Sequence, residues 1–265
     1  MNRPGGRAAG VRGKAGGAAS DDVRKANRKK CPRAVALDAL IAYETSGFWS
    51  VEKLHSAILK AGFDARDAAF VSWLCGTVLR NIRLIDYNLA KYSKIKLTKL
   101  ETRILCLLRL GAVQLIFSQS VPAHAAINET VSLAGRQASG YVNGVLRSLS
   151  KADDYFTIIE PDIIKRFAIR YSHAEWIVEE AFRLFGQDSA EKLLASAAEA
   201  PHAELQINTL RVGLEECEAS LASQGVSVTR HPLMQGTLIA ADTGDMTRLE
   251  AFQKGWFWVQ DSGAR

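Results

Sequence analysis

Apolar positions recur at a helical period through the first half of the chain and at a period of two near its end. Between Pro32 and about Lys151 they form seven or so short helical segments joined by brief polar links, a pattern typical of an all-α bundle. The segment 104–117 is apolar on nearly every face, which predicts a helix at the centre of the bundle. The run is only 14 residues long and Arg109 interrupts it, so it is too short for a membrane span.

Within the bundle, a helix is expected over residues 82–92, ahead of a basic link. Residues 161–200 also follow the helical period, with a break at Gly186.

Several of the expected helix starts carry capping signals. The capping motifs are Asp64-x-x-Asp67, Thr98-x-x-Glu101, Ser172-x-x-Glu175 and Asp188-x-x-Glu191.

After Pro201 the apolar period changes to that of β-strands. The expected order is β-α-β-β-α-β, the ferredoxin-like arrangement. The strands are 205–208, 226–230, 237–240 and 256–260, and the helices are 214–223 and 246–252. In the last strand Trp256 and Trp258 should point to one face of the sheet. There they would either stack on unpaired bases or pack on neighbouring structure.

Charge is segregated along the chain, and this distribution says more about a binding partner than the net charge of +6 does. Residues 1–33 carry ten basic and two acidic side chains, residues 72–110 eight and two, and residues 151–265 eleven and eighteen. A basic tail and a basic stripe beside an acidic C-terminal part indicate a polyanionic partner, although a solvated helix face gives the same pattern. The candidate RNA-binding residues are Arg28, Arg33, Arg80, Arg83, Lys91, Lys94, Lys96, Lys99 and Arg103.

The residue types that carry catalysis or bind metal form no constellation in this sequence. The five histidines are scattered, and the four cysteines lack the spacing of a zinc site or a disulfide framework. We predict no catalytic, cofactor-binding or metal-ligating residue, and expect Cys75 and Cys106 to be small core residues. The first 30 residues have no apolar core of a signal peptide, so we expect a reducing, cytoplasmic location and no membrane partner.

Two sets of motifs resemble a known family. The first set is Gly76-Thr77-Val78-Leu79-Arg80, Arg109-Leu110-Gly111-Ala112-Val113-Gln114-Leu115, Val121-Pro122 and Tyr141-Val142-Asn143-Gly144-Val145-Leu146-Arg147. The second set is Arg170-Tyr171-Ser172-His173-Ala174-Glu175-Trp176, Gln206-Ile207-Asn208-Thr209-Leu210 and Gly255-Trp256-Phe257-Trp258-Val259-Gln260-Asp261. The first resembles the NusB-type RNA-binding domain. Together the two resemble the start of ribosomal RNA cytosine-C5 methyltransferases of the RsmB (Sun/Fmu) family.

The resemblance implies a multidomain chain. We expect a disordered basic tail over 1–28, an all-α NusB-like helical bundle over 29–152, and helices with a small α+β ferredoxin-like domain over 158–265. It implies methyl transfer from S-adenosylmethionine to a cytosine of small-subunit (16S) ribosomal RNA in the full-length family. The family's cofactor loop and two cysteines would follow after Asp261, where this sequence has only four more residues. We therefore expect this chain to bind RNA, to hold no cofactor and to transfer no methyl group alone.

The resemblance leaves two other functions open. One is a NusB-like transcription antitermination factor without enzymatic activity. The other is a helical adaptor, because NusB-type domains also bind a ribosomal protein. The family usually has Arg-x-Asn where this chain has Gln206-Ile207-Asn208, so an RNA contact by that arginine is not carried over.

Overall fold

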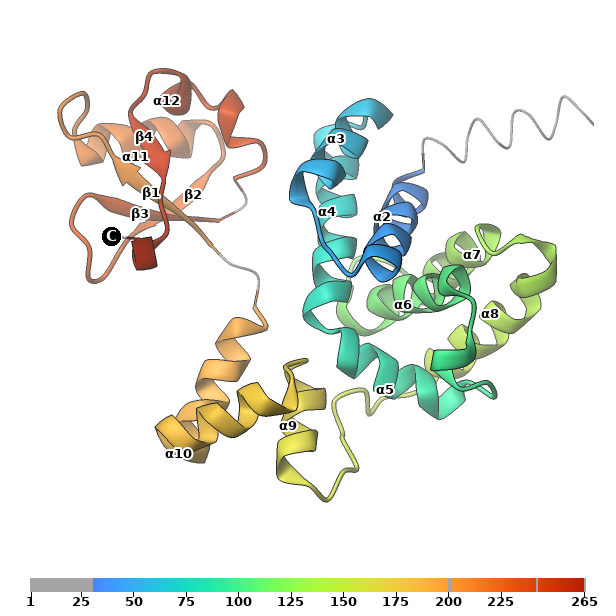
Figure 1. Ribbon diagram of the computed structural model, residues 1–265. Coiled ribbons are helices and arrows are strands. Elements are labelled where there is room, and N and C mark those ends of the chain that lie inside the picture. Colours follow the sequence, from blue (N-terminus) through green and yellow to red (C-terminus); the bar gives the residue numbers. More distant parts are fainter. Residues whose placement is uncertain (1–30, 200–201, 242, 265) are drawn as a thin grey trace, which may run out of the picture. The chain divides into compact units, whose positions relative to one another are not determined.

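The computed structural model describes residues 31–199, 202–241 and 243–264, and it divides into two units, Met1–Ile159 and Glu160–Arg265 (Figure 1). The tail predicted over residues 1–28 lies outside the described residues. Each unit has its own core of buried apolar side chains.

The first unit is the predicted all-α bundle. Its helices are α2 (Pro32–Ser46), α3 (Val51–Ala61), α4 (Ala65–Arg80), α5 (Ile82–Tyr92), α6 (Thr102–Phe117), α7 (Ala123–Ser132) and α8 (Gly135–Leu149), with a short 3-10 turn η1 (Leu97–Lys99). Helix α6 contacts α2, α4, α5, α7 and α8, and its residues 106–114 are all buried. The central position predicted for the segment 104–117 is confirmed.

A glycine sets the distance between α6 and α8. A Cβ atom at Gly111 would overlap the Cδ1 methyl of Leu146 and lie 2.8 Å from its Cδ2. Leu146 is fully buried in the bundle core, so it has little room to move. The two helices approach closely because residue 111 has no side chain.

Of two helix caps predicted in the bundle, one is present in the structure and the other is not. Asp64 caps α4 as predicted, its Oδ1 accepting a hydrogen bond of 2.8 Å from the Asp67 amide. The capping box predicted at Thr98 and Glu101 is wrong. Thr98 lies in the 3-10 turn, and α6 begins at Thr102 without a side-chain cap. The extended backbone of Leu100 separates the two elements, so Thr98 is out of reach of the first turn.

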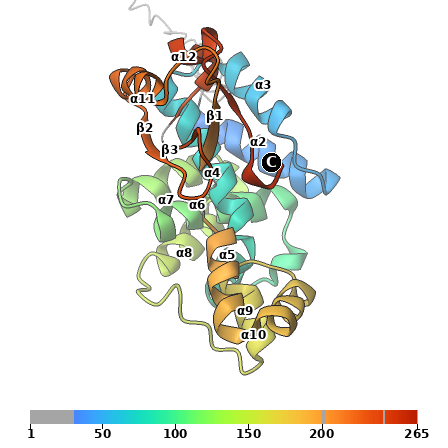
Figure 2. The same cartoon turned by 90° about the vertical axis from the view of Figure 1, so that its left-hand side faces the viewer.

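The second unit begins with a pair of packed helices, α9 (Ile163–Arg170) and α10 (Glu175–Ala197), which lie side by side (Figure 2). Gly186 interrupts α10 with a left-handed φ of 70°, as its position in the sequence predicted. The cap predicted at Ser172 is wrong, because Ser172 itself has φ 55° and α10 starts after Ala174 without a side-chain cap.

The rest of the second unit is the predicted ferredoxin-like fold. Its strands are β1 (Ala203–Ile207), β2 (Ser227–Arg230), β3 (Thr237–Ala241) and β4 (Phe257–Val259), and its helices are α11 (Leu214–Ser223) and α12 (Glu250–Gln253). The sheet order is β2-β3-β1-β4, and every pairing is antiparallel. The helix predicted over 246–252 is instead a 3-10 turn η2 (Met246–Arg248) followed by α12, and a last turn η3 spans Ser262–Ala264.

The aromatic last strand departs from the simple alternation that we predicted. Phe257 is 3% exposed and packs in the sheet core, whereas Trp258 is 46% exposed. Trp256 precedes the strand and packs, partly buried, against the same core as Phe257. Only Trp258 of the two tryptophans therefore offers an open face.

Candidate nucleic-acid interface

A short basic loop between α5 and α6 is the most exposed part of the predicted stripe. We call residues 93–99 the lysine loop, after Lys94, Lys96 and Lys99. All three ammonium side chains are exposed, and none forms an ion pair within the described residues. Three unpaired cations within six residues are the arrangement that neutralises neighbouring phosphates.

The lysine loop is fixed at both ends by hydrogen bonds. At its start, the Ser93 hydroxyl lies 2.6 Å from the Tyr141 hydroxyl of α8. At its end, the Lys99 amide donates to the Lys96 carbonyl at 2.8 Å, which closes η1. The lysines therefore project from a backbone of defined shape.

The first turn of α6 extends this basic surface toward α8. Arg103 donates to the Leu133 carbonyl at 3.2 Å, at the junction between α7 and α8. Arg136 is exposed in the first turn of α8, between Leu133, which accepts from Arg103, and Tyr141, which contacts Ser93. Arg136 is not among the RNA-binding residues predicted from the sequence. Arg136 comes near the basic surface only through the contacts of Leu133 and Tyr141, which lie far along the sequence from residues 93–103.

Lys91 already has partners inside the bundle. Its Nζ lies 3.8 Å from the Asp154 carboxylate and 4.8 Å from the centre of the Tyr87 ring. A phosphate at Lys91 would compete with Asp154, so Lys91 offers less free charge than the lysine loop does.

Arg80 and Arg83 lie at the corner where α4 meets α5, whose axes are bent by 80°. The guanidinium of Arg80 folds over Gly76, where a Cβ would lie 3.0 Å from its Nη1. Partial burial lowers the pKa of Arg80, although a guanidinium keeps its charge at any physiological pH. Arg83 is exposed in the first turn of α5.

Arg33 belongs to a different part of the bundle from the lysine loop. Its Nε donates to Gln114 at 2.8 Å, and its guanidinium lies over Phe70. Arg28 lies outside the described residues. Lys94, Lys96, Lys99 and Arg103 follow one another along the chain, and the structure places Arg33 apart from them, beside Phe70 and Gln114.

Arg109 is a basic residue of the same segment that serves the core instead. It is 7% exposed and binds Asp86 of α5 and Glu44 of α2. Burial alone would lower the pKa of Arg109, but hydrogen bonds and charge from Asp86 and Glu44 raise it above the usual value. This residue holds three helices together and has no free charge for a ligand.

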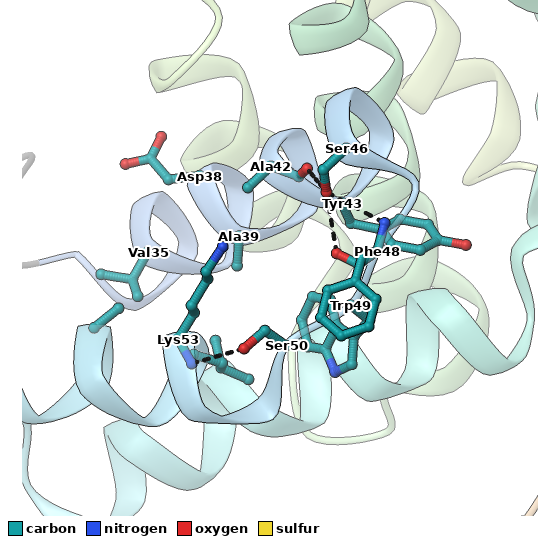
Figure 3. A pocket seen from close by; sticks show the side chains of 12 residues that line it. Val35, Asp38, Ala39, Ala42, Tyr43, Ser46, Phe48, Trp49, Ser50 and Lys53 are labelled. Carbon is teal, nitrogen blue, oxygen red and sulfur yellow. Dashed lines mark hydrogen bonds between the residues drawn. The ribbon is translucent and has the colours of Figure 1, made fainter.

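A mostly apolar cavity of about 280 Å³ lies between α2 and α3 (Figure 3). Helix α2 contributes Val35, Ala39 and Tyr43 to its lining, and the connecting loop contributes Phe48 and Trp49. Its polar side chains include a hydroxyl that is already satisfied locally, since Ser46 Oγ donates to the Ala42 carbonyl at 2.8 Å. Its two charged lining residues, Asp38 and Lys53, form no ion pair with each other.

The thiols are not placed for catalysis. Burial raises the pKa of Cys75 to about 12 and that of Cys106 to about 11, so both stay protonated and inert at neutral pH. Their predicted role as small core residues is confirmed. No group of three or more metal-ligating side chains occurs in the part of the chain that the structure describes.

No single helix among the described residues is long and apolar enough to cross a membrane, and the bent pair α4 and α5 meets that criterion only as a pair.

Family comparisons match both units of the chain. The NusB family model matches residues 30–151. The Methyltr_RsmF/B-like, ferredoxin-like domain matches residues 173–247. Both domains that the sequence motifs resembled are confirmed, in the predicted order.

Curated relatives carry the name of one enzyme. The chain is 28% identical over 242 residues to the probable ribosomal RNA small subunit methyltransferase B of Bacillus subtilis (strain 168), covering 89% of this chain and 54% of the relative. It is 30% identical over 215 residues to the protein of the same name in Synechocystis sp., covering 79% of this chain and 48% of the relative. The chain thus spans about half the length of the curated relatives it matches.

Among solved structures, the crystal structure of PH0851 shares this fold, with a TM-score of 0.58 at 18% identity. The match covers 87% of this chain and 53% of that chain.

Proposed function

Because residues 30–151 form a NusB domain and residues 173–247 an RsmF/B-like ferredoxin-like domain, we propose that this chain is the RNA-binding N-terminal portion of a 16S ribosomal RNA (cytosine-C5)-methyltransferase. The single observation that carries the RNA-binding role is the lysine loop, with three exposed cations on a fixed backbone and no acidic partner among the described residues. Its role is to hold and orient the ribosomal RNA.

S-adenosylmethionine is the cofactor expected of such an enzyme, and the described residues do not fit it. In open α/β sheets, nucleotide-like cofactors bind at the carboxyl ends of parallel strands, on a glycine-rich turn that opens a helix. The sheet of this chain has only antiparallel pairings. We therefore assign no cofactor contact and no step of methyl transfer to the described residues.

The ferredoxin-like domain supports this function over a free-standing antitermination factor, since its family model is that of the RsmF/B methyltransferases. We propose small-subunit ribosomal RNA as the partner and the cytoplasm as the location. The cysteines support a reducing compartment, because Cys31, Cys75, Cys106 and Cys217 are all free thiols.

The test is binding of the chain to a small-subunit ribosomal RNA fragment, followed by fluorescence anisotropy between about 50 and 200 mM salt. The affinity should fall steeply with salt. The triple variant Lys94→Ala, Lys96→Ala, Lys99→Ala should reduce the slope of log affinity against log salt by about 2, since each lost phosphate contact on a single strand removes about 0.7.

The matched control removes three exposed lysines elsewhere, in the triple variant Lys53→Ala, Lys60→Ala, Lys192→Ala. This control should keep most of the affinity and slope, because it lowers the net charge equally without touching the lysine loop. If both variants weaken binding to the same extent, the charge acts without a defined site. Salt-independent or absent RNA binding would instead support the adaptor function.

A further inference from the structure

A second cavity in the helical bundle lies away from the lysine loop and is lined by residues that are not part of that loop. It measures about 860 Å³ and opens between the start of α2, the first half of α4 and the segment 117–121 after α6. Phe70 and Trp73 of α4 and the guanidinium groups of Arg33 and Arg66 line it. Aromatic rings and guanidinium groups together are the side chains that bind unpaired nucleotides.

The aromatic wall is a stacked pair one helical turn apart. The rings of Phe70 and Trp73 have centres 5.9 Å apart and planes 11° apart. Both side chains are only half-buried, although they rest against the bundle core. The Trp73 ring is left partly open to water, so a base can stack on it.

Arg33 is held in place beside this wall. Its Cζ lies 5.0 Å from the centre of the Phe70 ring. Its Nε donates to Oε1 of Gln114, a fully buried amide whose own Nε2 donates to the Leu110 carbonyl at 2.7 Å. The two terminal nitrogens of Arg33 make no hydrogen bond to the described residues. The guanidinium is thus oriented in advance, with donors left for a phosphate.

Arg66 supplies a second cation on the rim. It is exposed in the first turn of α4 and forms no ion pair with any described residue. A cation at the N-terminal end of a helix opposes the helix dipole, so helix stability does not account for Arg66.

Two carboxylates also line the cavity, Asp67 and Glu129. They would repel a continuous run of phosphates, which argues against a duplex groove at this place. A carboxylate does accept hydrogen bonds from the amino groups of base edges. The mixture of aromatic, cationic and acidic side chains therefore fits one splayed nucleotide better than a helical RNA backbone.

We propose that this cavity binds a single unpaired nucleotide of the RNA, with its base stacked on Trp73 and its phosphate held by Arg33 and Arg66. The proposal rests on the proposed function as an RNA-binding chain and adds a site to it. The lysine loop contributes charge, whereas this cavity selects single-stranded RNA.

The direct test is fluorine NMR of the chain labelled with 5-fluorotryptophan. The Trp73 resonance is assigned by its loss in Trp73→Phe, and a short single-stranded RNA oligonucleotide is then added. The Trp73 resonance should shift, while that of Trp49, in the cavity between α2 and α3, should stay in place. A duplex of the same sequence should leave both resonances unchanged.

Affinities of variants for the same oligonucleotide complete the test. Trp73→Leu keeps the apolar bulk and removes the aromatic plane, so it should bind about tenfold more weakly, and Trp73→Phe should restore most of the loss. Arg66→Ala, which removes no side-chain hydrogen bond or ion pair with the described residues, should bind about threefold more weakly with a salt slope smaller by about 0.7. Phe48→Ala and Lys60→Ala serve as controls for an exposed ring and an exposed cation.

The outcomes separate the two proposals. If the oligonucleotide binds through the lysine loop but the Trp73 resonance and the affinity of Arg66→Ala do not change, the cavity proposal is wrong and the proposed function stands. A Trp73 shift of equal size with the duplex also overturns the cavity proposal. If no RNA binds at all, both proposals fail.

Discussion

Arg109 of α6 forms a two-pronged hydrogen-bonded ion pair with Asp86 of α5, with Nε to Oδ1 at 2.8 Å and Nη2 to Oδ2 at 2.7 Å. The third nitrogen, Nη1, lies 2.5 Å from Glu44 of α2. The one charged side chain in the buried stretch 106–114 of α6 is thereby matched by a carboxylate on both sides. The pairing also removes one acid and one base from the basic segment, so the charge offered to a ligand is that of the lysine loop and its neighbours.

We predict that Arg109→Met destabilises the helical bundle by about 3 kcal/mol, because it leaves two carboxylates close together without their cation. Urea unfolding of the chain, followed by circular dichroism, measures the loss. Arg183→Ala removes an exposed ion pair with Glu180 and should change stability by less than about 0.5 kcal/mol. Combining Arg109→Met with Asp86→Asn should cost less than the sum of the two single changes. Strict additivity would contradict the coupling.

A second prediction concerns the contact between α6 and α8. Gly111→Ala places a methyl group against Leu146 and should destabilise the bundle by about 1–3 kcal/mol. Gly144→Ala is the matched control, since a Cβ there meets nothing within 4 Å. It should instead stabilise α8 by about 0.5–1 kcal/mol, because alanine loses less backbone entropy in a helix. Thermal melting of both variants measures the two effects, and equal effects would contradict the close approach at Gly111.

A third prediction distinguishes the helix cap that exists from the one that the sequence suggested wrongly. Asp64→Ala removes the hydrogen bond to the Asp67 amide and should cost about 1 kcal/mol. Thr98→Ala should change stability by less than about 0.5 kcal/mol, because Thr98 caps no helix. Denaturant midpoints of the two variants provide the comparison, and a larger loss for Thr98→Ala would restore the predicted capping box.

The buried thiol of Cys75 gives a prediction on pH. In the folded chain the pKa of Cys75 is raised from 9.0 to about 12 by burial, so the unfolded state releases its proton first as pH rises. The contribution of Cys75 is therefore fully present below pH 9 and is lost between pH 9 and about 12, by up to about 1.4 kcal/mol per pH unit. Urea titrations of the chain and of Cys75→Ala across this range should show the stability difference between them shrinking. A constant difference would contradict the prediction.

A fifth prediction follows from the partners of Lys91. Asp154→Asn removes the carboxylate 3.8 Å from Lys91 and should raise the affinity for single-stranded RNA about twofold at low salt. Asp153→Asn removes the same charge one residue away, where no ion pair is formed within the described residues. Anisotropy titrations should show a larger gain for Asp154→Asn. Equal gains would mean that only the overall charge matters.

Much of the fold follows from local pattern. The helical period before Lys151 and the strand period after Pro201 predicted the bundle, its central helix and the β-α-β-β-α-β order, because burial of one face imposes a period on the sequence. The helix caps were predicted less reliably than the order of the elements. Asp64 was correctly predicted, whereas Thr98 and Ser172 were not, because a 3-10 turn and a left-handed residue place the true helix starts a few residues further along.

The candidate site shows more clearly which features the sequence alone does not predict. The crowding of basic residues in the segment before the central helix is evident from the sequence alone, because composition and charge are read directly from it. The individual roles of these basic residues follow from their contacts in the folded chain. The tertiary structure buried Arg109 against acids from two other helices and joined Arg33 to Gln114 across 81 positions, facing a cavity that no local motif marks. Pairings between distant helices depend on packing, which local periodicity does not encode.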